Sequence, residues 1–318
     1  MNTSKRVVLF GRAAPRLYIN EVAVRDGFQS EAGFVPTEDK IRLVNRLSRT
    51  GLAKIEVTSF VSPKAIPNLR DAEQVMRGID RQPGVRYVAL VPNERGSERA
   101  LACGADEINL VMSIGESHNL ANMRMTCEQS LAQFRRVMQV VRGSGMRVNG
   151  TVATAFGCPF DGDQPVCRLL WAVEQYLEMG MDSITLADTT GMAHPRQVSE
   201  VSRAFLDTFR GVEMTLHFHD TRGMGLANVI AGVAEGVAHF DASLGGIGGC
   251  PYAPGATGNI CTEDLVHMLL SCGFETGVDL DALIDVAREM PAIVGHPVPG
   301  HVLQAGKRTE LHARPVAA

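Results

Sequence analysis

Short apolar segments alternate with longer amphipathic segments along most of this chain. The short segments are apolar or alternating, and each is closed by Gly, Pro, Asp or Ser, which is typical of strands that end in turns. The segments between them are typical of helices. This alternation predicts repeated βα units around a parallel sheet. The eight expected strands are residues 17–25, 54–60, 86–91, 107–112, 147–155, 183–187, 213–219 and 239–244.

The expected helices lie between these strands. In residues 38–49 apolar side chains recur near helical spacing, and we expect Thr37 to cap this helix and Gly51 to end it. The other expected helices are residues 126–142, 165–180, 262–273 and 279–290.

A closed (β/α)₈ TIM barrel is the fold that this pattern favours. An open doubly wound sheet is the alternative, but no GxGxxG opens the first βα turn, and polar clusters recur where several strands end. We expect one domain over residues 1–318, with the barrel core in about 17–273 and a helix and tail in about 279–318.

Composition narrows the possible partners. The chain is 45% apolar and 21% charged, as in globular proteins, and its net charge of −4 lacks the basic excess that nucleic-acid binding requires. The first residues hold only a four-residue apolar run, too short for a signal peptide or a membrane span. Seven scattered cysteines indicate reduced thiols. We therefore expect a cytoplasmic protein that binds neither nucleic acid nor membrane.

The segment TLHFHDT carries two histidines on one face of an expected strand. Side chains alternate along a strand, so Thr215, His217 and His219 point one way and the apolar residues between them point the other way. A lone histidine is more often a core or surface residue than a ligand. A pair on one face near the end of a barrel strand is a candidate metal site.

Charged residues end the first strand and lie within the second. Arg25 and Asp26 come before the turn at Gly27, where they form either a surface ion pair or part of a catalytic rim. If they form part of a catalytic rim, Asp26 adds an oxygen ligand to the two imidazoles at the metal site. Arg25 then supplies a permanent positive charge that stabilises a developing oxyanion. Glu56 lies between Ile55 and Val57, so we expect it inside the barrel, paired with Arg25 or with water bound to a metal.

The segment 245–259, GGIGGCPYAPGATGN, follows the eighth expected strand and contains six glycines and two prolines. This composition suits a mobile lid that approaches a ligand closely, although a plain connection is the alternative. Within it, Cys250 is a candidate acid or base. Asn259 either binds a metal through its side-chain oxygen or caps the helix that begins near Thr262.

Several motifs together resemble the 3-hydroxy-3-methylglutaryl-CoA lyase family of metal-dependent barrel enzymes. They are VRDGFQSE, GLAKIEVTSFVSPKAIPNL, LADTTGM, LHFHDT, and GGCPYAPGATGN followed by ICTEDLVHML, and they cover nearly the whole barrel. The resemblance implies a homo-oligomer that cleaves an acyl-CoA substrate with one Mg²⁺ or Mn²⁺. The implied metal ligands are Asp26, His217, His219 and Asn259.

The resemblance also implies catalytic roles. Arg25 would stabilise the enolate oxygen, and Cys250 would protonate the enolate carbon. The base that takes the hydroxyl proton stays open among Asp26, His217 and Glu56. Residues expected to contact the substrate or belong to the lid are Gln29, Asp188, Gly249, Pro251 and Tyr252.

The chain departs from the family pattern after the RDG turn. Phe28 stands where Leu is expected, and Ser30, Glu31 and Ala32 stand in place of the expected NEK, so a cation is lost near the mouth. This leaves the acyl group open, from 3-methyl to longer 3-alkyl branches. The other readings are a Claisen-type synthase that condenses acetyl-CoA with a 2-oxo acid, and a noncatalytic acyl-CoA-binding protein.

Overall fold

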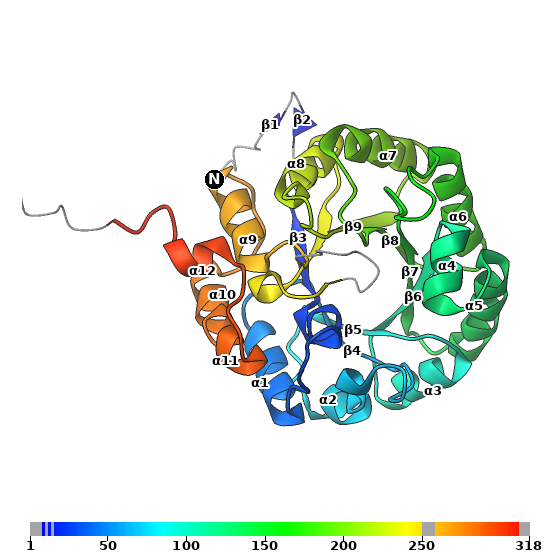
Figure 1. Ribbon diagram of the computed structural model, residues 1–318, viewed down its shortest axis with the longest axis horizontal. Coiled ribbons are helices and arrows are strands. Elements are labelled where there is room, and N and C mark those ends of the chain that lie inside the picture. The colour runs from blue at the N-terminus through cyan, green and yellow to red at the C-terminus, as the bar shows by residue number, and fades with distance from the viewer. Residues whose placement is uncertain (1–7, 10–11, 14–15, 250–257, 312–318) are drawn as a thin grey trace, which may run out of the picture.

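The computed structural model describes residues 8–9, 12–13, 16–249 and 258–311. Eight parallel strands close into a barrel in the order β10-β3-β4-β5-β6-β7-β8-β9, with helices around the outside (Figure 1). The TIM-barrel prediction is therefore confirmed. The barrel strands are β3 (Tyr18–Glu21), β4 (Lys54–Ser59), β5 (Arg86–Leu90), β6 (Glu107–Ser113), β7 (Arg147–Ala153), β8 (Ser183–Asp188), β9 (Glu213–Phe218) and β10 (His239–Ala242).

Helices follow the strands and cover the barrel. Those around the barrel are α1 (Thr37–Leu47), α2 (Ala72–Gly78), α3 (Glu94–Ala102), α4 (Glu116–Met123), α5 (Cys127–Val141), α6 (Val166–Glu178), α7 (Pro195–Thr208), α8 (Gly225–Glu235) and α9 (Thr262–Ser271). Three helices follow, α10 (Leu280–Ala287), α11 (Met290–Val294) and α12 (His301–Ala305), and α10 packs against α9 and α1. Short helical turns are η2 (Pro67–Leu69) and η3 (Leu244–Gly246), and β1 (Val8–Leu9) pairs with β2 (Arg12–Ala13) outside the barrel.

The capping prediction for the first helix is wrong. Thr37 is the first residue of α1 rather than its cap, and the hydroxyl of Thr37 donates to Asp71 at 2.9 Å. Pro36 precedes the helix, and its fixed φ suits a chain that enters a helix.

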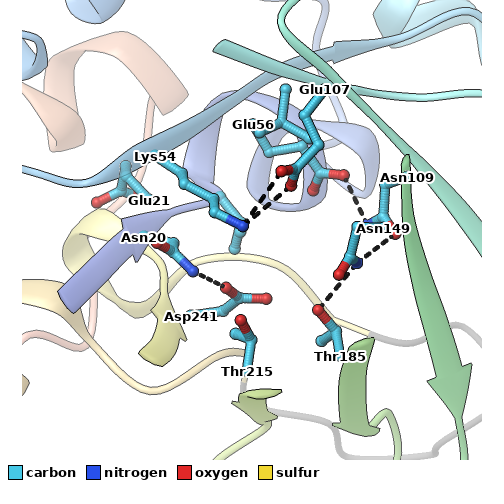
Figure 2. Close-up of a pocket in the computed structure, with 12 residues that line it drawn as sticks. Asn20, Glu21, Lys54, Glu56, Glu107, Asn109, Asn149, Thr185, Thr215 and Asp241 are labelled. Carbon is cyan, nitrogen blue, oxygen red and sulfur yellow. Dashed lines mark hydrogen bonds and ion pairs between the residues drawn. The ribbon is translucent and has the colours of Figure 1, made fainter. Parts of the chain in front are cut away.

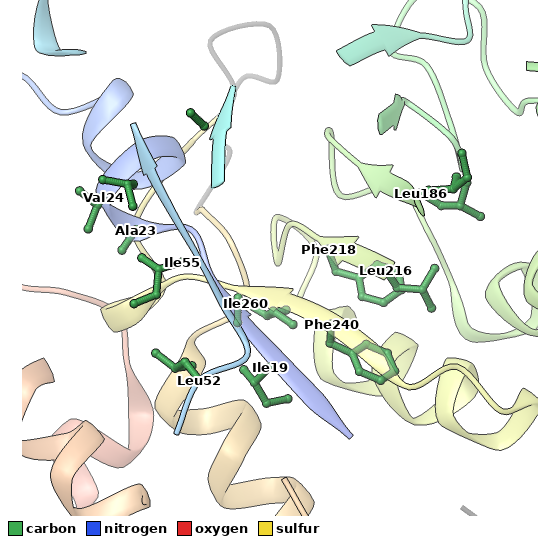
Figure 3. Close-up of a cluster of buried hydrophobic side chains, with 14 of the residues drawn as sticks. Ile19, Ala23, Val24, Leu52, Ile55, Leu186, Leu216, Phe218, Phe240 and Ile260 are labelled. Carbon is green, nitrogen blue, oxygen red and sulfur yellow. The ribbon is translucent and has the colours of Figure 1, made fainter. Parts of the chain in front are cut away.

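The apolar core lies between the barrel and its helices. Outward side chains such as Ile19, Leu216, Phe218 and Phe240 are fully buried there (Figure 3). The inside of the barrel is polar instead: Lys54 contacts Glu107 at 3.0 Å and Glu213 at 2.7 Å near the amino ends of the strands. Lys54, Glu107 and other polar side chains line a cavity of about 30 Å³ (Figure 2). No described helix is both long enough and apolar enough to cross a lipid bilayer.

The first barrel strand is shorter than expected. It ends at Glu21, and η1 (Ala23–Gly27) forms one turn of π-helix where residues 22–25 were expected to continue the strand. The Glu21 carboxylate explains this: it accepts the backbone N–H groups of Ala23 at 2.8 Å and Leu244 at 2.9 Å and the hydroxyl of Thr262 at 2.7 Å. These bonds turn the chain away from the sheet. Turns of π-helix are frequent at functional sites, and this one carries Arg25 and Asp26.

Glu21 also makes stability depend on pH. Burial raises its pKa from 4.5 to about 7. The folded protein therefore keeps the proton while the unfolded chain loses it, and the unfolding free energy falls as pH rises from 4.5 to about 7, by about 3 kcal/mol. The amide oxygen of Glu21→Gln can accept both backbone N–H groups, its NH₂ group can donate to the Thr262 hydroxyl oxygen, and the amide does not ionise. We expect urea unfolding between pH 4.5 and pH 8 to show a smaller decline for this variant than for the parent.

The exposed Glu98 provides the matched control, because Glu98→Gln removes a carboxylate that α3 presents to solvent. This control should follow the parent at every pH. Parallel curves for Glu21→Gln and the parent would contradict the account of Glu21.

Candidate active site

Four residues expected to bind a metal meet at the carboxyl ends of the strands. Asp26 comes from η1, His217 from β9, and His219 from the residue just beyond β9. One ligand atom from each of these three lies within 4.8 Å of the other two. Asn259 reaches the same place because its backbone bridges His219, and its amide donates to Asp26 Oδ2 at 2.7 Å. The structure thus brings together side chains from distant parts of the sequence.

Strand geometry aims the two imidazoles. Phe218 between them is fully buried in the outer core, so His217 and His219 both point to the inside, with ring centroids 5.2 Å apart. His219 Nε2 lies 3.8 Å from Asp26 Oδ2. The alternation read from the sequence therefore placed these rings correctly.

The donor set fits a divalent cation. His217, His219 and Asn259 are 8%, 5% and 3% exposed, and among the described residues Asn259 Oδ1 finds no hydrogen-bond partner. A buried polar atom without a partner costs free energy, and a bound cation would use such lone pairs. Two imidazole nitrogens, a carboxylate and an amide oxygen are ligands that Mn²⁺, Mg²⁺ and Zn²⁺ accept to different degrees.

Burial and charge keep Asp26 and His219 in the forms that bind metals. At His217 burial lowers the pKa, but the Asp241 carboxylate outweighs burial and raises the pKa. Burial works against ionised Asp26, but the charges of Arg25 and of the two histidines outweigh burial and lower the pKa of its carboxyl. Burial, with the neighbouring His217, lowers the pKa of His219 to about 4. Asp26 is therefore an anion and His219 a neutral base at pH 7.

Arg25 is fixed between two carboxylates. Its Nε donates to Glu56 Oε2 at 2.6 Å and its Nη1 to Asp26 Oδ1 at 2.7 Å, which confirms the expected pairing of Glu56 with Arg25. A bulge in β4 at Glu56 and Thr58 lies beside this contact. Burial opposes the charge of Arg25, but the two carboxylates outweigh it and raise the pKa of the guanidinium. The result is a permanent cation in a fixed position beside the cluster of Asp26, His217 and His219.

Asp188, another expected site residue, is held by the backbone of the loop that follows it. Both carboxylate oxygens of Asp188, at the end of β8, accept backbone N–H groups, from Met192 at 2.8 Å and Ala193 at 3.1 Å. Burial raises the pKa of Asp188 to about 6. These bonds brace the loop after β8. The side chain of Asp188 is 1% exposed, so it supports the site from below the surface.

The expected lid is described only at its ends. Gly249 donates its backbone N–H to the Ser30 hydroxyl at 3.1 Å, next to the half-buried Gln29 in the turn after η1. Cys250, Pro251 and Tyr252 lie outside the described residues.

The alternative role of Asn259 as a helix cap is wrong. Cys261 precedes α9 and makes no side-chain capping bond, while the Asn259 amide also donates to the Ile247 carbonyl at 3.1 Å. The side chain of Asn259 therefore belongs to the site and not to the helix.

Asp241 is a residue near the site that the sequence reading missed. Its Oδ2 lies 3.3 Å from His217 Nδ1, and the two residues are paired directly across β10 and β9. The segment HFDA contains the signal, since it places an acid on the inward face of the strand next to the histidine strand.

Known proteins resemble this chain over most of its length. The family model described as HMGL-like matches residues 16–290. A hydroxymethylglutaryl-CoA lyase of Bacillus subtilis is 44% identical, over 92% of this chain and 98% of its own. An (R)-citramalyl-CoA lyase of Chloroflexus aurantiacus is 41% identical, over 91% of this chain and 94% of its own.

Solved structures agree with the sequence relatives. An HMG-CoA lyase of Acinetobacter baumannii, in complex with coenzyme A and 3-methylmalate, superimposes with a TM-score of 0.91 at 52% identity. The match covers 94% of this chain and 98% of that one. With the family model and these relatives in agreement, this chain belongs to the HMGL-like family.

Proposed function

We propose that this chain is a divalent-metal-dependent carbon–carbon lyase that cleaves 3-hydroxy-3-methylglutaryl-CoA, or a close 3-hydroxy-3-alkylglutaryl-CoA, into acetyl-CoA and a 3-oxo acid. The observation that carries the proposal is the buried cluster of Asp26, His217 and His219 beside the fixed cation of Arg25. The family supports it, since its sequence relatives include lyases named for acyl-CoA substrates.

The reaction needs a proton removed at one end of the substrate and negative charge stabilised at the other. The C3 hydroxyl loses its proton, the bond between C2 and C3 breaks, and its electrons collect on the thioester oxygen as an enolate. Mg²⁺ or Mn²⁺ held by Asp26, His217, His219 and Asn259 would polarise the substrate oxygens and ease the loss of that proton. The candidate bases are Asp26, His217 and Glu56. The first two belong to the cluster, and Glu56 lies beside it in contact with Arg25.

Arg25 is the group that suits the enolate oxygen. Glu56 and Asp26 hold its Nε and Nη1, so the guanidinium does not have to reorganise when charge develops. A fixed donor of this kind typically contributes about 3–4 kcal/mol to the transition state.

A proton must then reach the enolate carbon. We assign this step to Cys250, whose thiol lies in the expected lid and is the donor implied by the family resemblance. Gly249, Pro251 and Tyr252 belong to the same segment, and with Gln29 we assign them to the substrate mouth.

The proposal includes a homo-oligomer in the cytoplasm that binds an acyl-CoA and neither nucleic acid nor membrane. Support for a reducing compartment comes from the six cysteines that the structure describes, all of which are free thiols. The net charge of −4 supports the absence of nucleic-acid binding.

Removal of the metal should stop the reaction. We expect acetyl-CoA from 3-hydroxy-3-methylglutaryl-CoA by mass spectrometry, loss of product after EDTA, and recovery when Mn²⁺ or Mg²⁺ is added back. A panel with longer 3-alkyl branches and with citramalyl-CoA identifies the preferred acyl group. Failure of every thioester in the panel to release acetyl-CoA with metal present would contradict the proposal.

Replacement of Cys250 by Ala should separate proton delivery from binding. We expect kcat to fall by roughly 10²–10⁴-fold, because a positioned acid is lost, with little change in the thioester dissociation constant. Cys167→Ala is the control, because Cys167 is an exposed thiol on α6. Equal rates for Cys250→Ala and this control would remove Cys250 from the mechanism.

A further inference from the structure

Three residues on neighbouring strands lie in one row inside the barrel. Asn20 on β3 is paired in register with Asp241 on β10, and Asp241 is paired with His217 on β9. The Asn20 amide donates to Asp241 Oδ1 at 2.9 Å, and Asp241 Oδ2 lies 3.3 Å from His217 Nδ1 (Figure 2 shows the first contact). Asn20 is 4% exposed and His217 is 8% exposed, so these contacts are largely shielded from solvent.

The carboxylate of Asp241 accepts a hydrogen bond at both of its oxygens, from Asn20 on one side and from His217 on the other. An ionised carboxylate only accepts hydrogen bonds, so Asp241 requires a donor at His217 Nδ1. A proton on Nδ1 leaves the lone pair of a neutral ring on Nε2, and Nε2 is then the nitrogen that can bind a cation. The same carboxylate selects the NH₂ group of Asn20, which donates to it, while Asn20 Oδ1 has no partner among the described residues.

We propose that Asp241, held by Asn20, is a positioning residue that fixes the tautomer of His217 with the proton on Nδ1 and thereby makes Nε2 available to the metal. The inference rests on the proposed metal site but concerns the ring even when no ion is present. Outer partners of this kind typically change metal affinity by 10- to 100-fold.

The variant Asp241→Leu tests the role of the carboxylate. Leu is close to Asp in size but offers no acceptor, so His217 Nδ1 loses the group that holds its proton. We expect the ring proton to be shared between Nδ1 and Nε2 and Mn²⁺ affinity to be lower by 10- to 100-fold.

The exchanged pair Asn20→Asp with Asp241→Asn should restore the row. The carboxylate at position 20 accepts from the amide at position 241, whose oxygen then faces His217 and again receives the Nδ1 proton. Most of the lost Mn²⁺ affinity should return. A residue that only fills space would give no such recovery, because Leu and Asn have similar sizes at position 241.

The measurements are a long-range ¹H–¹⁵N NMR spectrum of histidine-labelled, ion-free protein and a titration with Mn²⁺ followed by electron paramagnetic resonance. At a pH high enough for a neutral ring, His217 should carry its proton on Nδ1 in the parent and in the exchanged pair, and on both nitrogens as a mixture in Asp241→Leu. Asp182→Asn is the control. Asp182 lies outside this row, near the opposite end of the barrel, where its Oδ2 accepts the backbone N–H of Val148 at 2.8 Å. Its Mn²⁺ affinity should equal that of the parent.

An unchanged tautomer in Asp241→Leu would overturn the inference, and so would a folded exchanged pair that regains no Mn²⁺ affinity. The single variant decides the tautomer by itself if the exchanged pair does not fold. Absence of Mn²⁺ binding by the parent would count against the proposed metal site instead, because the ion-free spectrum reports on Asp241 alone.

Discussion

The buried carboxylate of Asp26 is the point on which the site depends. Burial makes an isolated carboxylate costly, and here Arg25 at 2.7 Å and the Asn259 amide at 2.7 Å compensate for it, with two imidazoles nearby. Arg25 is the neighbouring residue in the chain, whereas Asn259 and the two histidines come from distant segments. The same contacts that keep Asp26 ionised therefore bring the candidate metal ligands and the cation of Arg25 into one place.

The polar interior of the barrel supports this arrangement from below. In many barrels of this type branched apolar side chains fill the inside. Here Asn20, Asp241 and Glu56 occupy inward positions under the cluster. Glu56 accepts a hydrogen bond from Arg25, Asp241 contacts His217, and Asn20 donates to Asp241. The apolar core between strands and helices supplies the rigidity, so the interior can be used for charge.

The sequence predicted the features that follow from local periodicity. Alternation along 213–219 placed His217 and His219 on one face, and alternation around Glu56 placed its carboxylate inside the barrel. Features set by distant partners were missed. The end of β3 depends on bonds from Glu21 to Leu244 and Thr262, and the role of Asp241 depends on the register between β10 and β9. Neighbouring residues show that Asp241 faces inward, but they do not give its register with His217 or the distant partners of Glu21.

The central claim is that one cation binds Asp26, His217, His219 and Asn259 together. Anomalous diffraction from crystals soaked in Mn²⁺ tests it most directly, because the scattering locates the ion without reference to any assumed reaction. The account predicts one strong peak within bonding distance of all four side chains. A peak elsewhere, or these side chains turned away from a shared ion, would contradict it.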